Sequence, residues 1–91
     1  MSTEETPEIR IKRLRMRAWH RGTKEMDLVL GGWADKHLAG ADAVTLDLFE
    51  RVLEEEDQDL YQWISGQRQA PEYMAEFARE LAQGAASDRV S

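Results

Sequence analysis

The segment 21–25, Arg-Gly-Thr-Lys-Glu, brings together a cation, a carboxylate and a glycine. If it is helical, Arg21 and Glu25 lie on one face, one turn apart. Gly22 between them removes a side chain, so another backbone or a ligand can approach closely. A local ion pair beside a helix start is the structural alternative, but in this order it stabilises a helix by only about 0.3–0.5 kcal/mol. The segment is therefore the first candidate for a binding site.

Several kinds of catalytic or metal site lack their residues. The chain has no cysteine, which excludes a thiol nucleophile, a disulfide and a cysteine-based metal site. Its two histidines, His20 and His37, are far apart in sequence, and no serine occupies a nucleophile elbow. The acidic run 54–59 lacks the glycine of a calcium-binding loop, and no zinc-ligand spacing is present. We therefore predict a protein that is not an enzyme.

Charge is distributed unevenly along the chain. Residues 1–24 hold seven Lys or Arg and three Glu, whereas residues 25–91 hold five Lys or Arg and fifteen Asp or Glu, which gives the net charge of −6. The basic cluster, Arg10 to Lys24, is either a solvated helix face or a surface for an acidic partner. A small nucleic-acid-binding module that uses this cluster is the alternative function, although an isoelectric point of about 4.8 argues against it.

Start and stop signals divide the chain into helices. Thr6 is a suitable cap and Pro7 a suitable first residue for a first helix. A second helix is expected from Thr23 to Ala39, because its apolar residues recur with helical spacing. Gly40 is a stop signal for it.

The second half of the chain predicts three more helices. Thr45 is expected to cap a helix through Glu55, and Asp57 to cap a short helix over residues 58–65 that Gly66 closes. Pro71 is expected at the first position of a fifth helix, which ends at Gly84. We therefore predict an all-α fold, a small five-helix bundle. A single domain over residues 6–84 is expected between a flexible N-terminus (1–5) and a flexible tail (85–91).

The sequence also bears on location and assembly. The longest strongly apolar run, residues 28–34, is far shorter than the roughly 20 residues that a membrane span requires. The first residues have neither the basic nor the apolar region of a secretory signal. We expect a cytoplasmic protein that is not inserted in a membrane, binds no nucleic acid and is monomeric when free.

Two motifs together resemble a known family. Residues 21–27 match an RGxxE motif, an apolar helix follows, and a leucine-rich helix then leads into an acidic segment that contains Asp59-Leu60-x-x-Trp63. In order, spacing and length, residues 9–82 are similar to the SdhE/Sdh5 family of FAD assembly factors, also called succinate dehydrogenase assembly factor 2.

The resemblance implies an assembly factor that promotes covalent attachment of FAD to the flavoprotein subunit of succinate dehydrogenase, and often of fumarate reductase. Such a protein binds no cofactor stably and acts on FAD carried by its partner. Motif matching gives Arg21, Gly22 and Glu25 as the functional residues at the partner interface. Neighbouring side chains and one from the acidic segment are further candidates for this interface: Arg15, Arg17, Trp19, His20, Lys24 and Asp59.

Overall fold

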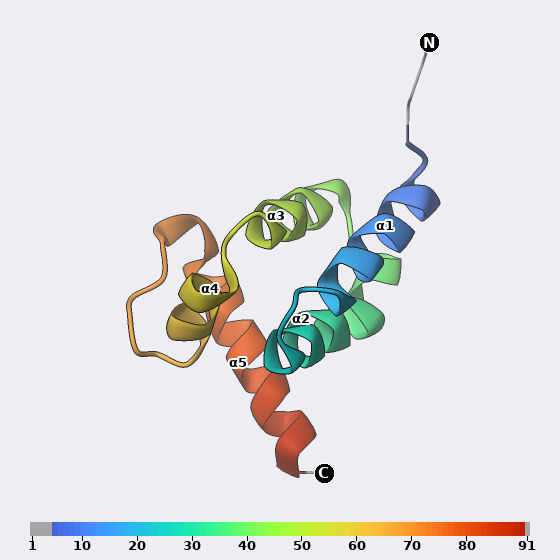
Figure 1. Cartoon of the computed structure of the whole chain (residues 1–91). Coiled ribbons are helices and arrows are strands. Elements are labelled where there is room, and N and C mark those ends of the chain that lie inside the picture. Colours follow the sequence, from blue (N-terminus) through green and yellow to red (C-terminus); the bar gives the residue numbers. More distant parts are fainter. Residues whose placement is uncertain (1–4, 91) are drawn as a thin grey trace.

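Two helices joined by a short loop form the first half of the structure. A computed structural model describes the backbone of residues 5–90 and the side chains of residues 5–85. Helix α1 spans Pro7–Trp19 and begins as predicted, because the Thr6 hydroxyl accepts the Ile9 N–H. Helix α2 spans Lys24–His37, capped by Thr23, and a 3-10 turn, η1, follows at Leu38–Gly40. The two helices lie side by side (Figure 1).

Helices α3 and α4 begin earlier than predicted. Helix α3 spans Ala43–Leu53 and is capped by Asp42, whose carboxylate accepts the Thr45 N–H. The predicted cap, Thr45, is wrong, because an acidic side chain stands three residues before it. Helix α4 spans Asp57–Ile64, so Asp57 is its first residue and not its cap. Gly66 adopts the predicted positive φ, +84°, just after the helix.

The last helix differs from the prediction at both ends. Pro71 precedes a short 3-10 helix, η2, at Glu72–Met74, and α5 then spans Ala75–Val90. The predicted end at Gly84 is wrong, since that glycine keeps a negative φ and α5 continues past it into residues 85–90, which were expected as a tail. Glycine often ends a helix in the left-handed conformation, but a glycine that stays helical costs only about 1 kcal/mol, so Gly84 does not by itself stop α5. Residues 1–4 and 91 of the two expected flexible ends lie outside the described residues.

Helix α2 is the centre of the bundle. It packs against α1 on one side and against α5 on the other, while α3 packs on α1 and α4 packs on α5 (Figure 1). The buried Trp33 ring stacks on Phe49 with ring centres 4.9 Å apart and meets Phe77 edge-on at 4.8 Å. Its indole N–H donates to Glu80 Oε2 at 2.6 Å. The described residues contain five α-helices and no strand, which confirms the predicted fold class.

Candidate functional site

The first part of the motif is a loop and not a helix. Thr23 is the N-cap of α2, and Gly22 before it has φ +111°, a conformation that residues with a side chain rarely adopt. A Cβ at Gly22 would meet no atom within 4 Å, so the backbone conformation is what requires glycine within this chain. The condition under which Arg21 and Glu25 would share a helical face is therefore not met, because α2 begins only at Lys24.

The Arg21 side chain points into the bundle. Its Nε donates to Asp57 Oδ1 at 2.8 Å, and its two terminal nitrogens donate to the backbone carbonyls of Leu53 and of Glu55, the latter at 2.5 Å. Only 11% of the Arg21 side chain and 20% of the Asp57 side chain are exposed. The planar guanidinium thus joins the loop before α2 to the turn between α3 and α4.

This arrangement explains the acidic run after α3. The last carbonyls of a helix lack partners within the helix and carry partial negative charge, so extra carboxylates there are unfavourable. Arg21 supplies the missing donors and the compensating positive charge. The sequence patterns did not reveal this pairing. They also did not reveal Asp27, whose carboxylate accepts the Arg21 backbone N–H at 2.6 Å and fixes the loop; an acid in the first turns of α2 was the available signal.

Glu25 is placed very differently from Arg21. It is the second residue of α2, its side chain is exposed, and no described residue forms an ion pair or hydrogen bond with its carboxylate. It lies on the rim of two grooves. One groove is lined by Trp19 and Leu28, and the other, which has a volume of about 200 Å³, is lined by Tyr61 of α4. Of the three motif residues Arg21, Gly22 and Glu25, Glu25 is therefore the one whose charge is available to a partner.

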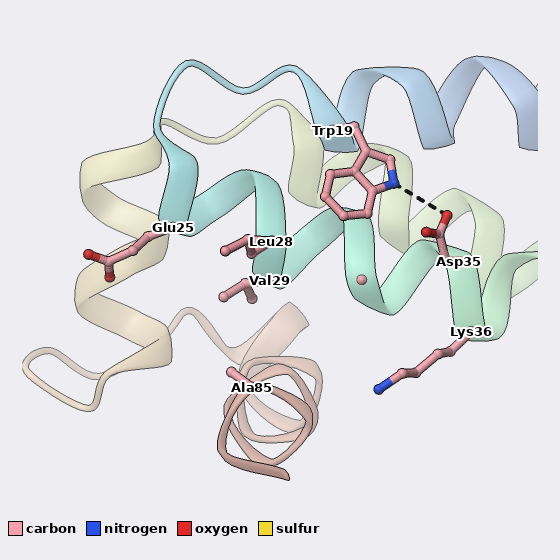
Figure 2. Close-up of a pocket in the computed structure, with 8 residues that line it drawn as sticks. Trp19, Glu25, Leu28, Val29, Asp35, Lys36 and Ala85 are labelled. Carbon is pink, nitrogen blue, oxygen red and sulfur yellow. Dashed lines mark hydrogen bonds between the residues drawn. The ribbon is translucent and has the colours of Figure 1, made fainter. Parts of the chain in front are cut away.

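The larger groove, the Trp19 groove, has a volume of about 450 Å³. Its lining consists of Trp19, Glu25, Leu28, Val29, Gly32, Asp35, Lys36 and Ala85 (Figure 2). Most of these residues come from one face of α2, while Trp19 closes one side and Ala85 of α5 contributes the opposite wall. The groove is thus an apolar surface with charged residues at its ends.

Gly31 fixes the position of Trp19. A Cβ at Gly31 would lie 2.8 Å from Cε3 of the indole, with two further ring carbons closer still, so the ring lies directly against the glycine backbone. The indole N–H donates to Asp35 Oδ1 at 3.3 Å (Figure 2). The predicted interface residue Trp19 therefore has a structural contact and, being only half-buried, also a surface that faces the groove.

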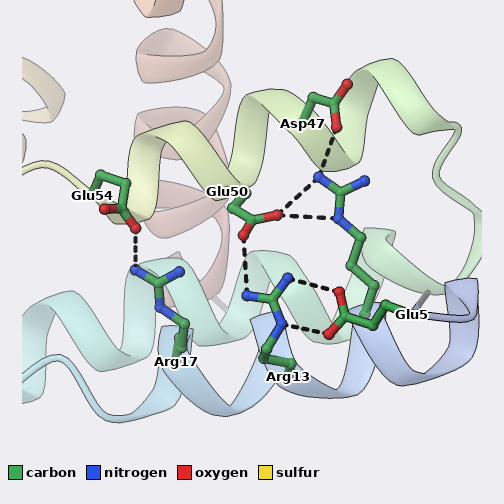
Figure 3. Close-up of polar contacts among 7 residues, drawn as sticks. Glu5, Arg13, Arg17, Asp47, Glu50 and Glu54 are labelled. Atoms are coloured by element: carbon green, nitrogen blue, oxygen red, sulfur yellow. Dashed lines mark hydrogen bonds and ion pairs between the residues drawn. The ribbon is translucent and has the colours of Figure 1, made fainter. Parts of the chain in front are cut away.

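The arginines of the basic cluster are engaged within the chain. Arg10 and Arg13 both pair with Glu50, at 2.9 and 3.1 Å, and Arg17 pairs with Glu54 at 2.7 Å, so these ion pairs link α1 to α3 (Figure 3). Arg15 pairs with Asp35 of α2 at 2.9 Å. Because these cations already have anionic partners, the cluster presents less positive charge than its sequence indicates.

The other residues predicted for the partner interface lie on different elements. His20 is the exposed C-cap of α1, and Lys24 is the exposed first residue of α2. Asp59 lies on α4 and pairs with Arg68 at 3.1 Å. Arg21, Gly22, Lys24 and Glu25 thus lie around the start of α2, Trp19 packs farther along that helix, and the contacts of Arg15, Arg17 and Asp59 lead away from it.

The Glu50 pairs predict a pH dependence of stability. The Arg13 guanidinium, together with that of Arg10, holds the pKa of the Glu50 carboxyl below its ordinary value in the folded chain. A lowered folded-state pKa stabilises the fold above the unfolded pKa of about 4.3, and this contribution is lost as the pH falls through the folded-state value.

We expect the midpoint of thermal unfolding, followed by circular dichroism, to fall between pH 5 and pH 3, and to fall less in Glu50→Gln. Glu54→Gln is the control, because that exposed carboxylate has a single exposed pair. If the unfolding midpoints of Glu50→Gln and the wild type fell equally between pH 5 and pH 3, the prediction would be contradicted.

Two further classes of site are not found in the described part of the chain. No three His, Asp or Glu side chains there are grouped to hold a metal ion. Among the same residues, no helix has the length and apolar character needed to cross a membrane.

Comparisons with known proteins find similarity over most of the chain. Residues 12–84 match a family described as flavinator of succinate dehydrogenase. The chain is 38% identical over 72 residues to the mitochondrial succinate dehydrogenase assembly factor 2 of Arabidopsis thaliana. This match covers 79% of this chain and 38% of that protein. It is 38% identical over 66 residues to the FAD assembly factor SdhE of Acetobacter pasteurianus, covering 72% of this chain and 61% of that protein. The matched region thus spans less than two thirds of either relative.

Proposed function

The chain belongs to the family of flavinators of succinate dehydrogenase, and from this premise we propose that it promotes covalent attachment of FAD to the flavoprotein subunit of that enzyme. In this proposal it acts as an assembly factor without a catalytic site of its own. It holds no cofactor stably and acts on the FAD that its partner carries. The flavoprotein subunit of fumarate reductase is proposed as a second client.

The placement of Glu25 is the observation that supports a partner-binding role. Arg21 uses its donors inside the bundle, and Gly22 provides a backbone conformation, so both shape the start of α2. Glu25 is then the motif's outward-facing charge, without a partner among the described residues. An unpaired carboxylate between two apolar grooves is suited to a charge-assisted hydrogen bond with an Arg or Lys of the client.

The physical contribution of such an assembly factor is positioning. Covalent attachment requires a histidine of the partner to be held close to the 8α-methyl carbon of the flavin, and holding reactants in place can remove a large part of a reaction barrier. A small rigid bundle that binds the client through Glu25 can hold a mobile part of the client in the competent pose. The paired arginines of α1 give the nucleic-acid alternative no support.

Glu25→Gln tests this proposal. We expect it to abolish the stimulation of flavinylation while the thermal unfolding midpoint stays within about 5 °C of the wild type, because an exposed side chain without a partner contributes little beyond its attraction to the positive start of α2. The measurement is in-gel flavin fluorescence of the denatured flavoprotein subunit from deletion cells that carry each variant, since only covalent flavin survives denaturation.

The matched control is Glu8→Gln. Glu8 is also an exposed glutamate at the second position of a helix, α1, and it lies outside both grooves. It should support flavinylation like the wild type. Full stimulation by Glu25→Gln would exclude the proposed role of the carboxylate, and an unchanged flavin signal in the deletion strain would exclude the proposed function itself.

A further inference from the structure

The Trp19 groove lies beside Glu25 and has no occupant from the described residues. Resting on the proposed function, we infer that this groove is the anchor site for one bulky apolar side chain of the client flavoprotein, adjacent in the client to an Arg or Lys that meets Glu25. The bound element is thus a short client segment in which an apolar and a cationic side chain lie next to each other. The shape, the lining and the charges of the groove each support this inference.

The lining of the groove exposes apolar surface that the fold does not use. Leu28 is 54% exposed although α2 is the central helix, and Val29 and Trp19 beside it are only half-buried. An exposed apolar patch rimmed by charged groups is typical of a protein–protein contact. A volume of about 450 Å³ accommodates a large aliphatic or aromatic side chain, the kind of anchor that dominates binding energy when it fills a pocket.

Two adjacent glycines keep the groove open. Each glycine inside α2 costs about 1 kcal/mol relative to alanine, so the pair is unfavourable for the helix itself. Gly31 allows Trp19 to lie flat against the helix and form the side wall. Gly32 lines the groove and, as a glycine, contributes no side chain to it. Neither glycine favours the helical conformation of α2, and both therefore serve the shape of the groove.

The charges around the groove specify the partner. Asp35 is held by Arg15 and by the Trp19 indole, and Lys36 has an interaction of its own. Glu25 is thus the groove charge that no described residue neutralises. An apolar client side chain that enters the groove brings its neighbouring residues close to this carboxylate. A cation there is attracted and an anion is repelled, so the groove selects an apolar residue flanked by Arg or Lys.

Two substitutions test the groove without touching Glu25. Leu28→Asp places a charge on its wall, and Gly32→Leu fills its floor with a residue that favours a helix. The measurement is isothermal titration calorimetry with the purified flavoprotein subunit. We expect both variants to raise the Kd roughly tenfold or more, as loss of an anchor contact does. Thermal unfolding of each variant is measured in parallel to show that it is folded.

The chain offers a matched control for each variant. Val44, on α3, is 76% exposed and lies outside the groove, so Val44→Asp should bind within about twofold of the wild type. A Cβ at Gly40 would meet no atom within 4 Å and its φ is not positive, so Gly40→Leu controls for replacing a glycine.

The outcomes distinguish failure of the anchor site from failure of the proposed function. If Leu28→Asp and Gly32→Leu bind like the wild type while Glu25→Gln does not, the anchor site is wrong and the proposed function stands. If the wild type neither binds the subunit nor stimulates flavinylation, both fail. If sedimentation shows a dimer that Leu28→Asp dissociates, the groove binds a second copy of this chain and the inference is overturned.

Discussion

Replacing Arg21 by alanine will lower the free energy of unfolding by about 3 kcal/mol, the range found when one partner of a largely buried ion pair is removed. The substitution leaves the Asp57 carboxylate without its cation and removes the donors to the Leu53 and Glu55 carbonyls. These acceptors are mostly sheltered from water, so water does not fully replace the lost bonds. For a chain of this size the unfolding midpoint should fall by more than about 10 °C.

Urea denaturation followed by circular dichroism measures this effect. Arg17→Ala is the matched control, because Arg17 also pairs with a carboxylate near the end of α3, but that pair is exposed. Removing the Arg17 side chain should lower the free energy of unfolding by less than about 1 kcal/mol. An Arg21→Ala variant as stable as Arg17→Ala would show that the inward contacts contribute little, and Arg21 would then have to be reconsidered as an interface residue.

Arg21→Lys extends the same argument. The substitution keeps the charge, but a compact ammonium group does not reproduce the fork geometry with which Arg21 reaches one carboxylate and two carbonyls. We expect it to recover only part of the stability that Arg21→Ala loses. Loss of function in either variant then follows from displacement of the loop that precedes α2, and restoring the fold at low temperature should restore part of the activity.

Replacing Gly31 by alanine will lower the free energy of unfolding by about 2 kcal/mol, although alanine favours a helix over glycine by about 1 kcal/mol. The new methyl group would occupy space held by the Trp19 ring, with Cε3 only 2.8 Å away. An aromatic ring packed against a helix has no flexible end that can move aside. The ring must leave its site, and its hydrogen bond to Asp35 is then lost.

Gly84→Ala provides the matched control for Gly31→Ala. Gly84 also lies inside a helix, but a Cβ there would meet no atom within 4 Å. This substitution should therefore stabilise the chain by about 0.5–1 kcal/mol. In the Trp19→Ala background, Gly31→Ala should no longer destabilise, because the obstructing ring is absent. Equal effects of the two glycine substitutions in the wild type would contradict the proposed contact.

Local signals in the sequence were sufficient for the helices and for the fold class. Thr6, Pro7 and Gly66 have the roles predicted for them, because caps and left-handed glycines depend on bonds within a few residues. Two predicted helix boundaries, the start of α3 and the end of α5, were wrong. Asp42 caps α3 in place of Thr45, and α5 continues through Gly84, which does not adopt the left-handed conformation that Gly66 has after α4.

The motif and its family could be found from the sequence alone, since residue types, spacing and order are properties of the chain. The direction of each side chain could not. Arg21 reaches groups 32 to 36 residues away, and only the packing of α3 and α4 beside the loop makes those acceptors available. Glu25, in contrast, is exposed at the edge of the groove that Trp19 also lines. The sequence thus determined the motif and the family, and the tertiary structure decided that Arg21 points into the bundle while Glu25 faces outward, because long-range contacts depend on neighbours that no local pattern specifies.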